Sequence, residues 1–303
     1  MKVIVTGATG LVGRALVRSL LSDGHSVTRL VRGESQGFRA PGTKAVHWQP
    51  EKGAVEAVEL EGHDAAVNLA GEPIAEGRWT DEKKRRIVES RVKGTRLLAE
   101  TLAGLKEKPS VLVSASAIGF YGDRGEEVLR EESASGEDFL SEVCREWEKA
   151  TLAASQAGVR VVHLRIGIVL SAEGGALEKM LTPFKLGVGG RVGDGRQYMS
   201  WITLDDLMSI IKRALTDEHL RGPVNAVAPG AVTNAEFTKA LGSALGRPTI
   251  FPMPAFAARL AFGEMADALL LSSARVEPAR LKEAGFEFAH AELEGALRHV
   301  LGK

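Results

Sequence analysis

Three glycines near the start of the chain have the spacing of a loop that binds phosphate groups. The β-branched apolar residues 3–5 are followed by Gly7, Gly10 and Gly13, and a helical pattern begins at Leu11. In such a loop one glycine allows a tight turn, one lets the backbone approach a pyrophosphate, and one lets helix and strand pack closely. The helix N-terminus offers unpaired N–H groups and a positive dipole end to the same anion. This order of elements predicts a dinucleotide-binding site, against the plainer alternative of a glycine-rich turn in another α/β protein.

The next apolar run bears on which dinucleotide binds. About 20 positions after the glycines, the residue that closes the second strand contacts the adenosine ribose, where an acid binds the 2′-hydroxyl and an arginine accommodates a 2′-phosphate. In residues 26–32 the closing residue is Arg32, which favours NADP over NAD. NAD stays open as an alternative, because Glu34 would take this position if the strand ran two residues longer. We interpret Arg29 as a solvated strand residue.

Composition narrows the function classes. The 303 residues carry 39 basic and 39 acidic side chains, a balance that argues against binding to nucleic acid or to a charged membrane surface. The single cysteine, Cys144, cannot form an internal disulfide, which is typical of a reducing cytosol. We expect no signal peptide, because the first strand starts at residue 3, and no apolar run in the sequence has the length of a membrane span. We expect a soluble cytoplasmic protein that acts on a small molecule, and its oligomeric state stays open.

The first half of the chain alternates apolar runs with helical patterns, which predicts a parallel sheet with crossover helices. After the first helix, strands are expected at 26–32, 64–71, 110–116 and 159–170, and helices at 80–105 and 138–157. Thr80 is a candidate N-cap, since two acidic residues follow it in the first turn. We interpret residues 39–61 as irregular and polar. The predicted fold class is α/β, with a doubly wound parallel sheet of Rossmann type.

The character of the chain changes after the last of these strands. Residues 171–200 are rich in glycine, and residues 231–303 are mostly helical and interrupted by prolines. We predict a dinucleotide-binding core over residues 1–170, to which the chain returns at about 201–230. The rest of residues 171–303 is expected to form a smaller substrate-binding or lid region.

With these elements in place, the chain resembles the extended short-chain dehydrogenase/reductase superfamily. TGATGLVG is similar to its phosphate loop, NLAG to its strand beside the adenine, VKGT to its central helix, and SASAIGFYG to the strand that supplies its active-site serine. More narrowly, NLAGEPI, SRVKGT, CREWE, LRIGIVLS, SWITLDDL and FGEMADALLLSSARVEPARLKEAGF resemble an atypical branch of nucleoside-diphosphate-sugar-epimerase-like proteins. The resemblance covers nearly the whole chain and implies an NADP-dependent oxidoreductase or epimerase-like enzyme.

The glycine loop and the resemblance together name the expected site residues. Cofactor contacts are expected from Gly7, Thr9, Gly10, Leu11, Val12, Gly13, Arg32, Leu69, Ala70, Gly71, Arg91, Ser114 and Arg165. The catalytic candidates are Ser116, which matches the superfamily's active-site serine, and Tyr121, the nearest phenol. No metal is expected, because the seven histidines lack metal-ligand spacing and Asp205–Asp206 looks like the start of a helix.

The superfamily's usual acid–base pair is missing. Its chemistry depends on a tyrosine and a lysine four residues later, whose charge lowers the pKa of the phenol. Neither Tyr121 nor Tyr198 has a lysine at that distance, and the expected positions of the pair hold Val143 and Trp147. If the protein is an enzyme, another group must move the proton. Tyr121→Phe is then expected to lower turnover and to leave folding unchanged.

Several candidates also have plainer interpretations. Tyr121 could be a packing residue, Cys144 a small buried hydrophobic residue and Glu148 a solvated helix residue. Cys144 and Glu148 nevertheless lie on the helix face that would carry the missing pair. Tyr198 and Trp201 could flank a substrate, although we prefer to interpret Trp201 as a core anchor.

Two classes of function remain. One is an NADP-dependent, epimerase-like oxidoreductase that acts on a small carbonyl or sugar-nucleotide substrate through an unusual acid–base group. The other is a dinucleotide-binding protein without chemistry, such as a redox sensor or a regulator. The phosphate loop is compatible with both, and the missing pair favours the second.

Overall fold

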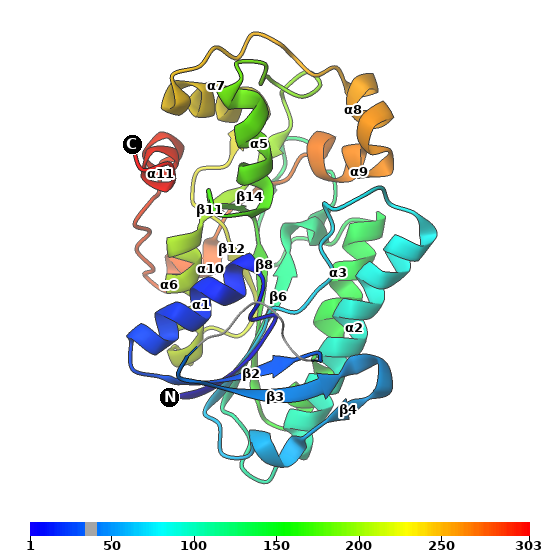
Figure 1. The fold of residues 1–303 in the computed structure, drawn as a ribbon, viewed down its shortest axis with the longest axis vertical. Helices are drawn as coiled ribbons and strands as arrows, with labels where there is room; N and C mark the ends of the chain where they lie inside the picture. The colour runs from blue at the N-terminus through cyan, green and yellow to red at the C-terminus, as the bar shows by residue number, and fades with distance from the viewer. Residues whose placement is uncertain (34–40) are drawn as a thin grey trace.

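The computed structural model describes residues 1–33 and 41–303, in which an eight-stranded sheet forms the framework (Figure 1). From edge to edge its strands are β12 (Gly222–Ala226), β8 (Arg160–Ile166), β6 (Val111–Ala117), β5 (Ala65–Asn68), β1 (Lys2–Thr6), β2 (Ser26–Val31), β3 (Thr43–Gln49) and β4 (Ala54–Val55). Neighbouring strands are parallel except for the antiparallel pair β3–β4. The chain adds strands first on one side of β1 and then on the other, so the predicted doubly wound α/β fold is confirmed.

Helices cover both faces of this sheet. On one face α1 (Leu11–Ser22) packs against α6 (Leu204–Thr216), and on the other α2 (Asp81–Gly104) packs against α3 (Phe139–Lys149) and α4 (Leu152–Gln156). Side chains of β1 alternate accordingly: Val3 and Val5 enter the core that includes residues of α1 and α6, and Ile4 enters the core that includes residues of α2. A parallel sheet needs this burial on both faces.

Short strands, further helices and short turns complete the fold. The short strands are β7 (Val128–Leu129), β9 (Ile168–Leu170), β10 (Tyr198–Met199), β11 (Trp201–Thr203), β13 (Val232–Thr233) and β14 (Arg275–Val276). The remaining α-helices are α5 (Gly175–Lys185), α7 (Asn234–Leu245), α8 (Ala255–Phe262), α9 (Glu264–Ala266), α10 (Ala279–Glu283) and α11 (Leu293–Val300). Short 3₁₀ turns are η1 (Pro50–Lys52), η2 (Ala57–Leu60) and η3 (Ile118–Tyr121), and η4 (Asp267–Leu271) is a π-helical turn.

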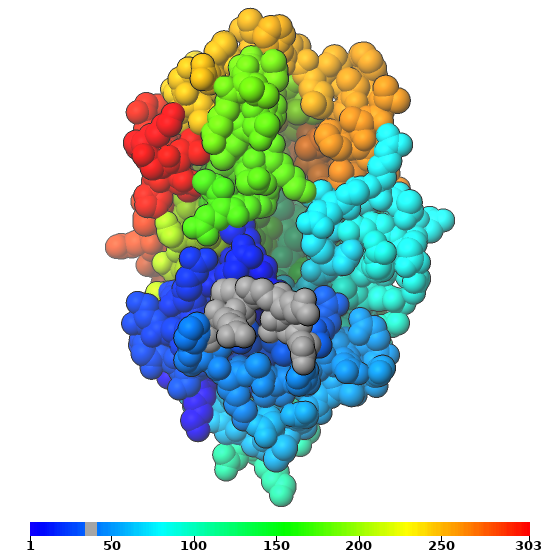
Figure 2. Space-filling model, in the orientation of Figure 1, coloured from blue at the N-terminus to red at the C-terminus, as the bar shows by residue number. Residues whose placement is uncertain are grey.

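The C-terminal helices gather beyond one end of the sheet. Figure 1 shows α5, α7, α8 and α9 at the upper end of the molecule, above the strands. The tail then returns to the core, since β14 pairs with β7 and α10 packs against β12. Between the green α5 segment and the cyan segment ahead of α2, the surface is hollowed above the N-terminal loop (Figure 2). The domain boundary near residue 170 stays a prediction.

The sequence-based elements need three adjustments. The segment 39–61 was expected to be irregular, which is wrong for its described part, because Thr43–Gln49 forms β3 and pairs with β2. Val46 and Trp48 are buried on one face of β3, an alternation that polar neighbours mask in the sequence. The expected helix 138–157 is divided into α3 and α4, and the expected strand 159–170 into β8 and β9.

Two further expectations can be compared with the described residues. Thr80 is the N-cap of α2, as predicted, and its hydroxyl accepts a hydrogen bond from the backbone N–H of Lys83 at 3.2 Å. Within residues 1–33 and 41–303, none of the helices combines the length and apolar character needed to cross a bilayer.

Candidate functional site

The glycine loop between β1 and α1 has two glycines that packing requires. Gly7 has a φ of 66°, and a Cβ built on it would lie 2.5 Å from the Leu69 carbonyl oxygen. A Cβ on Gly13 would lie 2.1 Å from the Gly7 carbonyl oxygen. Neither position can accept a side chain without moving backbone, so both glycines are needed for strand, loop and helix to pack closely.

Gly10 serves a different purpose. A Cβ at this exposed residue would meet, among the described residues, only the Gly7 carbonyl oxygen, at an ordinary contact distance of 3.5 Å. Gly10 is also the N-cap of α1, where the described side chains supply no capping hydrogen bond and the first turn carries no acidic residue. Thr9 beside it is exposed, and Leu11 and Val12 are half-buried. The positive end of α1 is therefore open to an anion.

The loop after β5 forms the neighbouring wall. The Thr6 hydroxyl accepts hydrogen bonds from the backbone N–H groups of Leu69 (3.1 Å) and Ala70 (3.2 Å). These bonds hold the loop against Gly7 at the carboxyl end of β1. The structure thus brings the predicted residues Leu69 and Ala70 beside the glycine loop, and their contact with a cofactor stays a prediction.

Arg91 on α2 closes the far side of this loop. Its guanidinium donates to the carbonyl oxygens of Glu72 (3.0 Å) and Ile87 (3.2 Å) and lies 4.9 Å from the centroid of the Trp147 ring. A Cβ on Gly71 would lie 3.1 Å from the Arg91 Cζ atom, so the two predicted residues are in contact. Burial lowers the pKa of Arg91.

Ser114 takes part in a buried network instead of pointing into open space. Asn68 donates to the hydroxyls of Thr95 (2.7 Å) and Ser114 (3.1 Å) and accepts from Thr6 (2.7 Å). The Trp147 indole N–H also donates to Thr95, at 2.9 Å. These bonds join β1, β5 and β6 to α2 and α3. Trp147, at one position of the missing acid–base pair, therefore has a structural hydrogen bond.

Ser116 is hydrogen-bonded to an acidic residue at the carboxyl end of β6. Its hydroxyl donates to Glu148 Oε1 at 2.8 Å. Arg165 on β8 binds the same carboxylate through two bonds, from Nε to Oε1 (2.8 Å) and from Nη2 to Oε2 (3.0 Å). Glu148 is largely buried and paired, so its interpretation as a solvated helix residue is wrong. Burial by itself lowers the pKa of Arg165, but the bonds and charge of Glu148 outweigh this effect and raise it.

Tyr121 lies on the other side of the same arginine. Its hydroxyl donates to Asn225 Oδ1 at 2.7 Å and accepts from Arg165 Nη1 at 3.0 Å, and the residue has no exposed surface. Burial raises the pKa of the phenol. Phe120 stacks on the guanidinium, whose Cζ lies 3.4 Å from the ring centroid. The geometry gives Tyr121 a structural role, and its catalytic role stays a prediction.

Glu131 is a member of this network that the sequence did not indicate. Its Oε1 accepts from the backbone N–H groups of Asn225 (3.0 Å) and Arg280 (3.3 Å). Its Oε2 has no hydrogen-bond partner within the described part of the chain. Burial raises the pKa of this carboxyl group. No motif in the sequence marks Glu131, because its partners are backbone groups from distant segments.

Two other candidate positions on α3 are packed into the core. Val143 and Cys144 are both buried, as the plainer interpretation of Cys144 requires. Burial raises the pKa of the Cys144 thiol to about 12. The thiol therefore stays protonated at neutral pH and is a poor nucleophile.

The two arginines of the second strand differ. Arg32 follows β2 and is exposed, with Nη1 3.9 Å from Glu51 Oε1. Arg29 is buried and its Nε donates to the Thr43 hydroxyl at 2.8 Å, so the interpretation of Arg29 as solvated is wrong. Pairing of β2 with β3 covers it. Glu34, the residue that would favour NAD, lies outside the described residues.

The two aromatic candidates, Tyr198 and Trp201, have different surroundings. Trp201 is fully buried and its indole N–H donates to the Gly230 carbonyl oxygen at 2.9 Å, which confirms the core-anchor interpretation. Tyr198 is half-buried, and Arg275 lies 5.0 Å from its ring centroid. Contact of Tyr198 with a substrate stays a prediction.

Comparison with known proteins gives matches along most of the chain. Residues 3–226 match the model of the NAD dependent epimerase/dehydratase family, and residues 253–300 match a domain of unknown function, DUF1731. An epimerase family protein of Mycobacterium tuberculosis is 43% identical over 299 residues, which cover 98% of this chain and 97% of that protein.

Two crystal structures are similar over the whole of this chain. Human epimerase family protein SDR39U1 (isoform 2), crystallised with NADPH, has a TM-score of 0.90 and 34% identity, with 100% of both chains covered. The nucleoside-diphosphate sugar epimerase from Corynebacterium glutamicum has a TM-score of 0.81 and 42% identity, with 100% of this chain and 58% of that chain covered.

Proposed function

The chain belongs to the NAD dependent epimerase/dehydratase family, and from this premise we propose that it is an NADPH-binding oxidoreductase or epimerase. In this proposal Ser116 and Glu148 replace the superfamily's tyrosine and lysine as the groups that handle the proton. The observation that carries it is the 2.8 Å hydrogen bond from the Ser116 hydroxyl to Glu148, at the carboxyl end of a central strand.

The residues around the glycine loop fit a dinucleotide. The pyrophosphate would bind beside Gly10, at the uncapped N-terminus of α1. The absence of a side chain at Gly10 leaves space there for the anion, and the backbone N–H groups of α1 can donate to it. Arg32, exposed at the end of β2, would bind the 2′-phosphate that distinguishes NADPH from NADH. The presence of NADPH in the human relative supports the same cofactor here. When bound, this cofactor supplies a hydride to a carbonyl carbon, and its oxidised form accepts one from an alcohol carbon.

The Ser116–Glu148 pair can move the accompanying proton. In the oxidation direction, the substrate hydroxyl would give its proton to the Ser116 oxygen as Ser116 gives its own proton to Glu148. Arg165 holds the Glu148 carboxylate through two hydrogen bonds, so that Oε1 stays within hydrogen-bond distance of the Ser116 hydroxyl. Reduction would return the proton by the same path. Both groups are largely buried, which limits competition from water.

The substrate class is a small carbonyl compound or a sugar nucleotide. The relative from Corynebacterium glutamicum is described as a nucleoside-diphosphate sugar epimerase, which supports the second kind. The hollow between α5 and the segment ahead of α2 offers room for a substrate near the glycine loop (Figure 2).

The test separates cofactor binding from turnover. NADPH affinity is measured by calorimetry, and sugar nucleotides and small carbonyl compounds are screened by the change in NADPH absorbance. On a substrate so found, Glu148→Gln should lower kcat by about 10²–10⁴-fold and leave NADPH affinity unchanged. Ser116→Ala should lower kcat less if bound water replaces the hydroxyl in the relay.

Glu146→Gln is the matched control, because Glu146 lies on the same helix and pairs only with the exposed Lys149 in the described residues. If Glu148→Gln turns over as fast as the control, the proton path is wrong. Saturable NADPH binding without turnover on any member of the panel would favour a redox sensor or regulator.

A further inference from the structure

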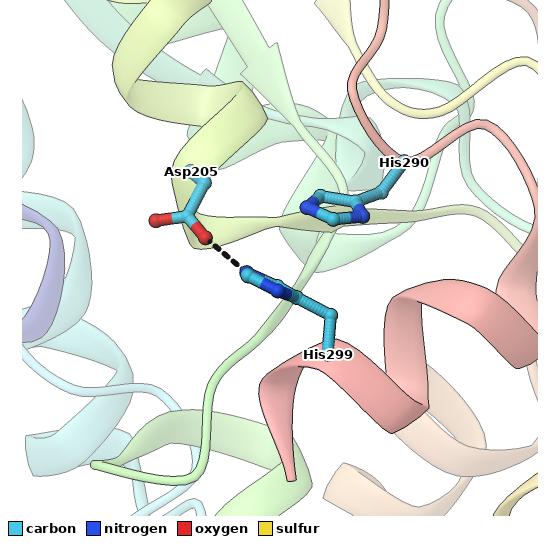
Figure 3. Close-up of side chains that lie close together, drawn as sticks. All are labelled: Asp205, His290 and His299. Atoms are coloured by element: carbon cyan, nitrogen blue, oxygen red, sulfur yellow. Dashed lines mark hydrogen bonds and ion pairs between the residues drawn. The ribbon is translucent and has the colours of Figure 1, made fainter. Parts of the chain in front are cut away.

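We propose that Asp205, His290 and His299 form a binding site for a divalent transition-metal ion, with Zn²⁺ as the preferred ion. The three side chains come from the start of α6, from the segment between α10 and α11, and from the last turn of α11 (Figure 3). None of them belongs to the glycine loop or to the Ser116–Glu148 pair, and no step of the proposed reaction uses them.

Each of the three residues offers one possible ligand atom. These atoms lie within 4.8 Å of one another, and Asp205 Oδ2 is already 2.7 Å from His299 Nε2. The two imidazole rings are stacked, with centroids 4.1 Å apart and an angle of 25° between their planes. Figure 3 shows the carboxylate of Asp205 facing the ends of both rings.

The backbone holds His290 in place independently of any metal. Asp206 is buried, and its carboxylate accepts from the backbone N–H groups of Ala289 (2.8 Å) and His290 (3.0 Å). The Thr203 hydroxyl also donates to Asp206, at 3.0 Å. This anchor fixes His290 beside the first turn of α6, where the adjacent Asp205 points outward.

The position of His299 is fixed from the other side. Leu293 and Leu297 of α11 are buried in the main core, and α11 packs against α7. His299 lies on the exposed face of the same helix, in its last turn, where the helix dipole favours a cation. The three ligands are therefore carried by segments that the core positions before any ion binds.

The ligand set selects the kind of ion. Two imidazoles and one carboxylate suit Zn²⁺ and related transition metals, whereas Mg²⁺ and Ca²⁺ prefer oxygen ligands. With zinc bonds of about 2.0–2.1 Å, tetrahedral ligand atoms are about 3.3 Å apart, so binding would require the three side chains to adjust their present spacing. Asp205 and His299 are exposed, which leaves a fourth position for water.

Such an ion would link the C-terminal helix α11 to α6 of the nucleotide-binding fold. An ion that binds only the folded state stabilises it by RT ln(1 + L/Kd), where L is the free-ion concentration, so the unfolding temperature rises with the logarithm of that concentration above Kd. The sequence did not indicate this metal site, because one of its ligands, Asp205, lies 94 positions before His299.

Calorimetry with ZnCl₂ tests the proposal on the full chain after treatment with EDTA and dialysis. We expect one Zn²⁺ per chain, and His290→Ala, His299→Ala and Asp205→Asn should each weaken binding by roughly tenfold or more. His47→Ala is the matched control, since it removes an exposed histidine from β3. It should retain the affinity of the parent.

CoCl₂ provides a second readout that depends on ligand geometry. The parent and His47→Ala should give the visible absorption of four-coordinate Co²⁺, and the three site variants should lose it. Circular dichroism of each variant checks that the loss does not come from unfolding. Absence of Zn²⁺ binding by the parent, or equal binding by the parent and all three site variants, overturns the proposal.

Discussion

Arg165 and Glu148 form a two-pronged ion pair that joins β8 to the last turn of α3, with bonds of 2.8 and 3.0 Å. The pair orients the carboxylate that accepts the Ser116 hydrogen bond, 2.8 Å away. A guanidinium bound through two parallel bonds fixes the direction of a carboxylate more strictly than a lysine could. The proposed proton acceptor is thus held by strands and helices and not by a loop.

Gly10→Val should separate folding from cofactor binding. An added Cβ at Gly10 meets only the Gly7 carbonyl oxygen, at 3.5 Å, among the described residues, so we expect the unfolding temperature to change little. The valine side chain would occupy the space proposed for the pyrophosphate, and NADPH affinity measured by calorimetry should fall by at least an order of magnitude, roughly. Gly13→Ala is the contrasting variant, because its Cβ would lie 2.1 Å from the Gly7 carbonyl oxygen and should destabilise the fold. Parental NADPH affinity in Gly10→Val would show that the pyrophosphate binds elsewhere.

Arg32→Asp should change the preference between the two nicotinamide cofactors. The guanidinium is exposed and 3.9 Å from Glu51, so it can turn toward a 2′-phosphate. Charge-assisted hydrogen bonds contribute about 1.5–3 kcal/mol, so NADPH affinity should fall by roughly one to two orders of magnitude. NADH affinity should be equal or better, as measured by the same titration. Arg96→Asp, on the exposed side of α2, is the control, and an unchanged NADPH/NADH ratio in Arg32→Asp would refute the assignment.

The sequence predicts the fold well where local signals and packing agree. The glycine loop, the Thr80 cap and the apolar strands each have a pattern that can be recognised along the chain. The β3 strand does not, because only Val46 and Trp48 of its seven residues are buried. Its pairing with β2 is a non-local contact, and the burial of Arg29 follows from that pairing.

The candidate site is predictable only in part for the same reason. Ser116 lies where a motif places it, but its partner Glu148 is 32 residues away on another element. A carboxylate on a helix looks solvated until the arginine of a neighbouring strand is seen beside it. Glu131 and the cluster of Asp205 with two histidines depend on still longer separations, so spacing along the chain cannot reveal them.

Glu131→Gln should make the stability of the protein less sensitive to pH. Burial raises the folded-state pKa of this carboxyl group above its unfolded value, so the folded state gains stability from the protonated form. That contribution is fully present below the unfolded pKa, near 4.3, and is lost as pH rises through the folded pKa. The parent should therefore lose stability relative to Glu131→Gln as pH rises from about 4 through the folded-state pKa.

Thermal unfolding at several pH values measures this difference. Each kcal/mol of change in the free energy of unfolding should change Tm by roughly 2–4 °C for a protein of this size. Glu132→Gln, at an exposed neighbouring position, is the control and should follow the parent at every pH. A constant difference in Tm between Glu131→Gln and the parent across this range would mean that Glu131 is ionised throughout.

Tyr121→Phe decides between a structural and a catalytic tyrosine. From the sequence alone, the variant is expected to fold normally and to lose turnover. The structure changes the first half of that expectation, because removal of the hydroxyl leaves Asn225 Oδ1 and one Arg165 N–H without their buried partner. An unsatisfied buried polar group costs about 1–3 kcal/mol, so Tm should fall by several degrees.

Kinetics on a substrate found in the screen complete this test. If Tyr121 is structural, the folded variant should retain kcat within a few-fold, whereas Glu148→Gln loses about 10²–10⁴-fold. Tyr198→Phe is the control for loss of a phenol elsewhere, at a half-buried ring beside Arg275. A Tyr121→Phe variant with parental stability and a kcat lowered as far as in Glu148→Gln would identify Tyr121 as the proton donor. The role of Glu148 would then be to orient Arg165, whose guanidinium bonds to both residues.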